Sequence, residues 1–203
     1  MATKWKGMTL EEADEKAKRI ASRGKNTLLT GPPGVGKTMI ARRIRDHLGD
    51  LTAPQKQDLA MIYAYSRMPI PAHFQRPFRA PHYTVSVVGL RGTPRYSVGE
   101  LVLSHLGVLF LDELPEFSRA CLEAVQEAVR NGCVRQGQTQ WCAPASFLLV
   151  ASALPCPCGW FGRTERRCTC SPTAVARYQH RVQVASAALG LEPFAVEPAF
   201  VER

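Results

Sequence analysis

Apolar and polar positions along the chain fall into segments typical of an α/β protein. Apolar runs of strand length occur at residues 26–30, 108–111 and 147–151. Residues 10–22 and 118–131 instead carry apolar side chains at the three- and four-residue spacing of amphipathic helices. Because strands and helices follow one another, the pattern predicts a parallel sheet covered by helices.

Capping residues indicate where these helices begin and end. Thr9 followed by Glu12 is a capping-box pattern for the helix at 10–22, and Gly132 ends the helix at 118–131. Elsewhere the pattern is less regular. It predicts helices at 57–67 and 177–181 and a hairpin or loop at 82–100. A second hairpin is expected at 133–141, turning at Gln136-Gly137.

Length and charge narrow the class of protein. The chain has 203 residues, of which 45% are hydrophobic and 21% charged, as expected for one globular domain. No apolar run approaches the ~18 residues of a membrane span, and the charged N-terminus lacks a signal segment. We therefore expect a cytoplasmic protein without a membrane partner. The net charge of +9 favours a polyanionic partner.

Residues 31–38 match the phosphate-binding pattern GxxxxGK[ST] between a predicted strand and a predicted helix. Glycines let backbone N–H groups surround phosphate oxygens, and the helix directs its positive end at the anion. The motif predicts that Lys37 reaches the β- and γ-phosphates of ATP and that Thr38 binds Mg²⁺. The residues expected to bind nucleotide are Gly31, Pro32, Pro33, Gly34, Val35, Gly36, Lys37, Thr38 and Met39.

The apolar run at 108–111 ends in two acidic residues, Asp112 and Glu113. The carboxyl end of a parallel strand lies where open α/β sheets bind ligands, beside the phosphate-binding loop. We therefore expect Asp112 to hold Mg²⁺ through water and Glu113 to act as general base toward an attacking water. Glu113 and Lys37 are the expected catalytic residues.

Seven cysteines fall into two groups. Their odd number and the missing signal segment disfavour a disulfide framework, so Cys121, Cys133 and Cys142 are expected to be small buried residues. The others form two C-x-C pairs separated by nine residues, which suits tetrahedral Zn²⁺. Four reduced cysteines in a Gly- and Pro-rich loop are the alternative. These residues are Cys156, Cys158, Cys168 and Cys170.

Three arginines lie between the two cysteine pairs: Arg163, Arg166 and Arg167. Guanidinium groups on a loop held by a metal would suit the phosphate backbone of DNA. Ordinary solvated side chains are the alternative interpretation.

Taken together, several motifs resemble the magnesium-chelatase-like AAA+ ATPases. They are GPPGVGKTMIARRI, RPFRAPHYTVS, GVLFLDELPEFSR and PCPCGWFG…CTCSP…RY. Within that family they are more similar to the bacterial competence-associated branch-migration helicases than to the chelatase motor subunit. The resemblance covers residues 8–181 and implies a P-loop NTPase with a three-layer αβα core. It also implies hairpin inserts around 82–95 and 133–141, and a ring of subunits with ATP between them.

The chain departs from the family pattern in its second half. The family has an Asn that orients the hydrolytic water where this chain has Leu154, and Ser152 is the candidate substitute. The family's Arg that contacts a neighbour's γ-phosphate, and its helical lid, are not recognisable after Arg181. We therefore expect a nucleotide-binding core at 1–181, with a Cys-rich loop at 155–171, and a diverged or irregular tail at 182–203.

Three functions fit the sequence. The first is an ATP-driven motor that acts on DNA, as in remodelling or branch migration. The second is the motor subunit of a metal chelatase, and the third is an ATP-binding module with weak turnover. All three need ATP and Mg²⁺, with Zn²⁺ as a further expected ligand. Further copies in a ring, or a partner ATPase subunit, are the expected protein partners, and DNA is the expected nucleic acid.

Overall fold

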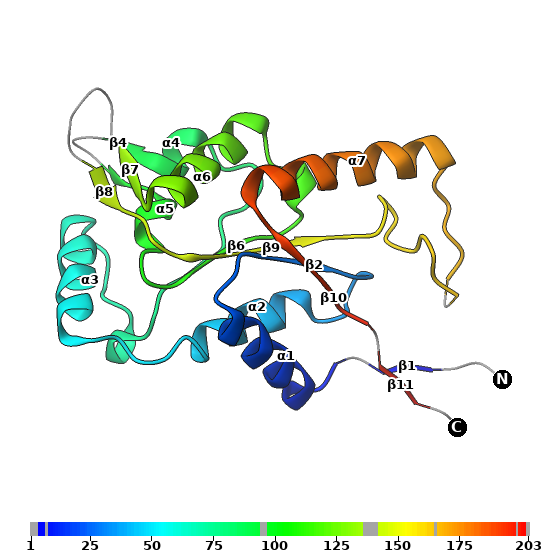
Figure 1. Ribbon diagram of the computed structural model, residues 1–203, viewed down its shortest axis with the longest axis horizontal. Coiled ribbons are helices and arrows are strands. Elements are labelled where there is room, and N and C mark those ends of the chain that lie inside the picture. Colours follow the sequence, from blue (N-terminus) through cyan, green and yellow to red (C-terminus); the bar gives the residue numbers. More distant parts are fainter. Residues whose placement is uncertain are drawn as a thin grey trace.

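The computed structural model describes residues 4–6, 8–93, 97–135, 142–164, 166–197 and 199–201, with side chains from 8 to 197 (Figure 1). A five-stranded parallel sheet in the order β10-β2-β9-β6-β3 forms its centre. The predicted α/β fold is thereby confirmed. The strands are β2 (Thr27–Thr30), β3 (Phe78–Arg79), β6 (Val108–Leu111), β9 (Leu148–Ala153) and β10 (Glu192–Ala195).

Helices cover both faces of the sheet, with α1 and α2 on one side and α6 and α7 on the other (Figure 1). Within the described ranges, no helix is both long and apolar enough to cross a membrane. The helices are α1 (Leu10–Arg23), α2 (Lys37–Asp46), α3 (Ala53–Tyr65), α4 (Val87–Arg91), α5 (Glu100–Leu103), α6 (Arg119–Asn131) and α7 (Pro172–Leu189). Two 3₁₀ turns, η1 (Ala72–Phe74) and η2 (Leu114–Glu116), complete them.

The apolar core is divided by the sheet into two layers. Strand side chains alternate between the faces, so Leu109 and Leu111 of β6 pack beneath α6, whereas Val108 and Phe110 pack against α1 and α2. All four of these side chains are buried. Continuous apolar strands are thus explained by helices on both faces, as in other parallel sheets.

The predicted capping box of α1 is present, and α3 begins earlier than the sequence predicts. The Thr9 hydroxyl accepts a hydrogen bond from the Glu12 amide (3.1 Å), and the Glu12 carboxylate accepts one from the Thr9 amide (2.8 Å). The helix expected at 57–67 spans Ala53–Tyr65 instead. Thr52 forms a second capping box there with Gln55, and this signal was overlooked.

The irregular tail expected at 182–203 is wrong for its first half. Helix α7 continues to Leu189, and β10 then pairs in parallel with β2. Helix α7 has a weak amphipathic pattern because apolar residues also lie on its exposed side, as Val184 does at 55% exposure. Pro193 lies within β10, which is an edge strand of this sheet, where the missing N–H of proline is tolerated.

Both expected hairpin inserts have described strands, with the first displaced. In place of a hairpin at 82–95 the chain forms α4 and then pairs β4 (Gly92–Thr93) with β5 (Ser97–Val98). The second insert pairs β7 (Cys133–Arg135) with β8 (Cys142–Pro144). Its expected turn at Gln136-Gly137 lies outside the described residues, as do 94–96 of the first. Strands β1 (Lys4–Lys6) and β11 (Ala199–Val201) form a separate antiparallel pair.

Candidate functional site

The loop between β2 and α2 closes around the side chain of Lys37. Gly36 precedes the helix with φ +94°, a left-handed conformation that favours glycine. The Lys37 ammonium donates hydrogen bonds to the carbonyl oxygens of Gly31 (2.9 Å) and Pro32 (2.8 Å). Burial lowers the pKa of Lys37 to about 8, while the nearby carboxylates of Asp112 and Glu113 act in the opposite direction.

The acidic residues after β6 lie beside this loop, as predicted. The Thr38 hydroxyl donates a hydrogen bond to Asp112 Oδ2 (3.4 Å), although the strands that precede the two residues, β2 and β6, are separated in the sheet by β9. A hydroxyl and a carboxylate next to a lysine form the donor set that holds hydrated Mg²⁺ against phosphate. The structure therefore brings together Lys37, Thr38, Asp112 and Glu113 at the carboxyl edge of the sheet.

Ser152 on the intervening strand β9 connects the two acidic residues. Its hydroxyl donates to Asp112 Oδ1 (2.5 Å) and accepts from the Glu113 amide (3.1 Å). The side chain is 1% exposed. Because a hydroxyl has a single hydrogen, and Asp112 receives it, Ser152 has none to donate to a water. Its contacts position Asp112 and Glu113, which differs from the expected part of a substitute for the family's Asn.

Glu113 has an unusual backbone conformation. Its φ and ψ are +57° and 52°, in the left-handed region that residues other than glycine seldom adopt. The hydrogen bond from its amide to Ser152 holds this conformation. Strained residues of this kind cluster at active sites, and the Glu113 carboxylate remains exposed to solvent.

Leu154 directly follows β9 and stands where the family has an Asn. Its amide donates a hydrogen bond to the Tyr178 hydroxyl of α7 (3.2 Å). Its side chain lines a cavity of about 460 Å³ together with Pro155 and Gln179. Gln179 also donates to the Pro155 carbonyl (3.2 Å), so α7 holds the beginning of the Cys-rich loop.

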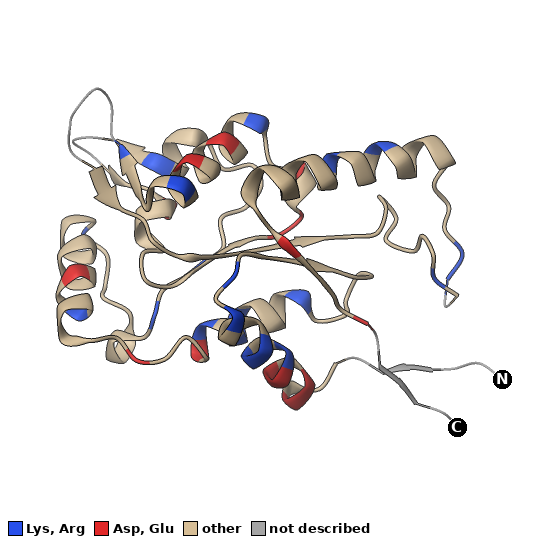
Figure 2. Ribbon diagram, viewed as in Figure 1, with Lys and Arg blue, Asp and Glu red and all other residues tan. Residues whose placement is uncertain are grey.

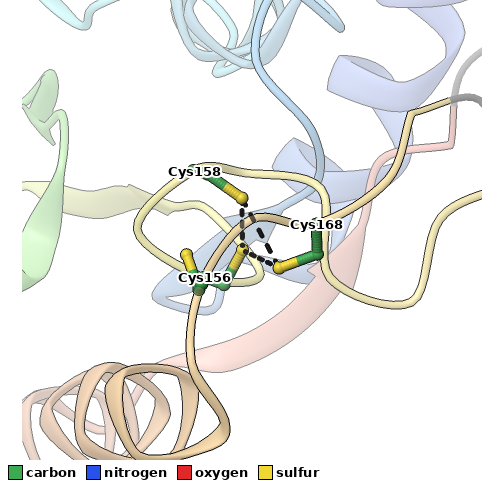
Figure 3. A group of neighbouring side chains, drawn as sticks. Cys156, Cys158 and Cys168 are labelled. Carbon is green, nitrogen blue, oxygen red and sulfur yellow. Dashed lines mark hydrogen bonds between the residues drawn. The ribbon is translucent and has the colours of Figure 1, made fainter.

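The Cys-rich loop gathers its four cysteines into one cluster. Figure 3 shows the sulfurs of Cys156, Cys158 and Cys168 facing one another, at separations of 3.4, 3.5 and 3.7 Å. With Cys170 included, all four sulfurs lie within 4.8 Å of one another. Backbone hydrogen bonds from Thr169 and Trp160 lower the pKa of Cys158 to about 5.

The same loop touches the phosphate-binding loop. Gly159 has φ +83°, and a Cβ there would come within 2.6 Å of the Pro33 ring. Only glycine fits this close approach. Neither the contact nor the role of Gly159 was predicted, because residues 126 positions apart in sequence give no local signal of it.

The three arginines of the loop have different surroundings. Arg163 pairs with Glu197 (2.6 Å), beyond β10, and its side chain is 19% exposed. The Arg166 guanidinium lies 5.6 Å from the centre of the Trp160 ring. Arg167 is exposed. The structure thus leaves Arg166 and Arg167 at the surface, whereas Arg163 ties the loop to the end of the sheet.

The expectation for the three remaining cysteines is right for Cys121 and wrong for Cys133 and Cys142. Cys121 is buried, and its thiol donates to the Val85 carbonyl. Cys133 and Cys142 instead form a disulfide across β7 and β8. Their Cα atoms are 5.7 Å apart, a separation that suits a disulfide.

Strand order, the loop after β2 and the acidic pair after β6 define a P-loop NTPase of the AAA+ class. Residues 6–187 match the family described as magnesium chelatase, subunit ChlI, and the chain belongs to that family. The resemblance drawn from the motifs is therefore confirmed.

Relatives agree with this assignment. The chain is 40% identical over 167 residues to the uncharacterised protein YifB of Escherichia coli, covering 80% of this chain and 33% of YifB. It is 37% identical over 174 residues to competence protein ComM of Haemophilus influenzae, covering 83% of this chain and 34% of ComM. The chain thus spans about a third of the length of these relatives.

Among solved structures, the fold is similar to NtrX from Brucella abortus in complex with ATP. The TM-score is 0.58 at 16% identity, with 94% of this chain and 38% of NtrX covered. At this identity the likeness concerns the fold alone.

Proposed function

We propose that this chain binds Mg·ATP at the carboxyl edge of the sheet, between the phosphate-binding loop and the end of β6. The observation that carries the proposal is the hydrogen bond from Thr38 to Asp112, next to the buried ammonium of Lys37. Lys37 and Thr38 open α2 and Asp112 follows β6, and together these side chains match the charge of a nucleotide phosphate with its metal. Calorimetric titration tests it: we expect saturable Mg·ATP binding, and none at millimolar nucleotide would refute the proposal.

Hydrolysis by the isolated chain is expected to be weak. Glu113 is the proposed general base, but Leu154 offers no side-chain hydrogen bond to an attacking water. An arginine from a neighbouring subunit is typically worth ~10³–10⁵ in rate, so turnover well below ~1 s⁻¹ is expected without a partner. We propose that the working unit is a ring of copies or a complex with a partner ATPase subunit. Sedimentation with and without Mg·ATP tests this assembly.

We further propose that DNA is the substrate on which this ATPase acts. The net charge of +9 and the similarity to competence protein ComM support DNA over a tetrapyrrole. Figure 2 marks Lys and Arg positions in the Cys-rich loop, at the opposite end of the molecule from α3. Arg166 and Arg167 are the proposed phosphate contacts, because Arg163 is already paired with Glu197.

A salt titration of duplex binding tests the DNA proposal. Each phosphate neutralised contributes a slope of about −0.9, so replacing Arg166 and Arg167 by alanine should reduce the slope by about 2. Arg23 and Arg130, exposed on α1 and α6, form the control pair with equal loss of charge. Equal effects of the two double variants would assign binding to overall charge. Binding weaker than ~10⁻⁴ M at low salt would leave an ATP-binding module without DNA.

A further inference from the structure

We propose that the Cys-rich loop is a structural zinc module and that Zn²⁺ is bound by all four of its cysteines. This metal site is separate from the Mg²⁺ of the nucleotide, and it does not depend on ATP binding. The ligands are Cys156, Cys158, Cys168 and Cys170.

The separations between sulfurs match a metal tetrahedron. With Zn–S bonds of ~2.3 Å, the sulfurs of a tetrahedral site lie about 3.8 Å apart. The three pairs among Cys156, Cys158 and Cys168 measure 3.4, 3.5 and 3.7 Å, and Cys170 completes the group within 4.8 Å. None of the four is in a disulfide. The two C-x-C pairs, which nine residues separate in sequence, thus meet at one point.

The backbone around Cys156 supports a thiolate. The Phe161 amide donates a hydrogen bond to Cys156 Sγ (3.3 Å), and the Gly159 amide donates to the Cys156 carbonyl (2.9 Å). Hydrogen bonds of this kind orient a metal ligand and stabilise its negative charge. Cys156 is fully buried, whereas the other three cysteines are half-buried, so the site has one wall toward the core.

The loop has little else to determine its shape. Most of its described residues between Cys158 and Cys170 are exposed, including Phe161 at 46%. It contains no helix or strand between β9 and α7 among the described residues. Without an apolar core, the ordering of the chain has to be offset by another interaction, and metal binding supplies such folding free energy.

The donor set selects the metal and its role. Four thiolates are soft ligands that favour Zn²⁺ over Mg²⁺ or Ca²⁺. Four protein ligands also complete a tetrahedron and leave no open position for a substrate, which is the arrangement of structural rather than catalytic zinc.

Elemental analysis of the whole chain, purified without chelator, tests the proposal. We expect one Zn²⁺ per chain in the wild type and loss of zinc in the double variant Cys158→Ser, Cys168→Ser. The matched control is Cys133→Ser, Cys142→Ser, which removes two cysteines of the same chain outside the cluster and should retain its zinc. Wild-type protein without zinc, or full zinc content in the cluster variant, overturns the proposal.

A second measurement covers the case in which the cluster variant does not fold. Titrating wild-type protein with an organomercurial should release zinc to a chelating dye as the cluster thiols react. Replacing zinc by Co²⁺ should give the visible absorption of a tetrahedral thiolate complex. Release of no zinc, or a Co²⁺ spectrum without thiolate coordination, contradicts the assignment. Both readouts are independent of nucleotide, so they also distinguish failure of this site from failure of the ATP proposal.

Discussion

Two irregular segments meet at the carboxyl edge of the sheet, and they obtain their shape in different ways. The phosphate-binding loop is anchored by the Lys37 ammonium on two of its own carbonyls and by Val35, which is 1% exposed. The Cys-rich loop is largely exposed; α7 holds its start through Gln179 and Pro155, and the pairing of Arg163 with Glu197 holds its middle. The core therefore shapes the first loop, whereas the second needs a ligand of its own.

This difference predicts where substitutions will act. Changes in the phosphate-binding loop should alter nucleotide affinity directly, whereas changes in the Cys-rich loop should act through the contact between Gly159 and Pro33. If both loops responded equally to every change, they would form one structural unit.

The largest effect is expected for Lys37→Ala. This change removes a buried cation that faces the phosphates, at a cost of about 2–4 kcal/mol, or a roughly 30- to 1000-fold loss of ATP affinity. Calorimetry with Mg·ATP measures it. Lys25→Ala is the control, because Lys25 is 63% exposed and pairs with Glu192 at the surface. Unchanged affinity in Lys37→Ala would place the nucleotide elsewhere.

The next largest effect is expected for Ser152→Ala. Asp112 would lose a donor and the Glu113 amide an acceptor, so the carboxylate that faces Mg²⁺ would be less fixed. Loss of a group that orients a metal ligand typically costs 10- to 100-fold in metal affinity, and we expect about tenfold in the Mg²⁺ needed for ATP binding. Ser104→Ala is the matched control, since Ser104 is equally buried but bonds to the Leu101 carbonyl. Equal Mg²⁺ dependence in the two variants would contradict a positioning role.

The sequence predicts the phosphate-binding loop and the acidic pair well, but it does not predict the contacts of Ser152. The loop at 31–38 and the acidic pair are local patterns whose chemistry requires adjacent residues, and the structure places them together as expected. The contact of Ser152 with Asp112 depends on the register of β9 against β6, which periodicity does not specify. Local patterns likewise do not predict the full length of α7 or the presence of β10. For β10 the reason is that Pro193 is acceptable only at a sheet edge, which the sequence does not identify.

The pH dependence of ATP binding should report on Lys37 alone. Its pKa is lowered to about 8 in the ligand-free protein, and only the charged form favours phosphate. The protonated fraction falls about tenfold from pH 7 to pH 9, so ATP affinity should fall by about that factor. The stability of the ligand-free protein should rise over pH 8 to 10.5, because the unfolded lysine keeps its proton to higher pH. Calorimetry and denaturation across this range measure both.

Lys37→Arg is the control for this pH effect. An arginine stays charged throughout the range, so its ATP affinity should vary little with pH even if it is weaker. A wild-type affinity that is constant from pH 7 to 9 would show that Lys37 does not titrate in this window.

The smallest effect is expected for Gly159→Ala, and it tests the link between the two loops. The added methyl group would lie 2.6 Å from the Pro33 ring, so the Cys-rich loop or the phosphate-binding loop has to shift. We expect ATP affinity to fall about threefold, or ~0.7 kcal/mol, while zinc content stays unchanged.

Gly162→Ala is the matched control in the same loop. Gly162 also has a positive φ (+72°), but nothing lies within 4 Å of its added methyl group. Both variants therefore have similar backbone strain, and only the first changes the contact with Pro33. If ATP affinity fell equally in both, the effect would come from loosening of the Cys-rich loop. If it fell in neither, the two loops would be independent, and the Cys-rich loop would serve a partner outside the nucleotide site.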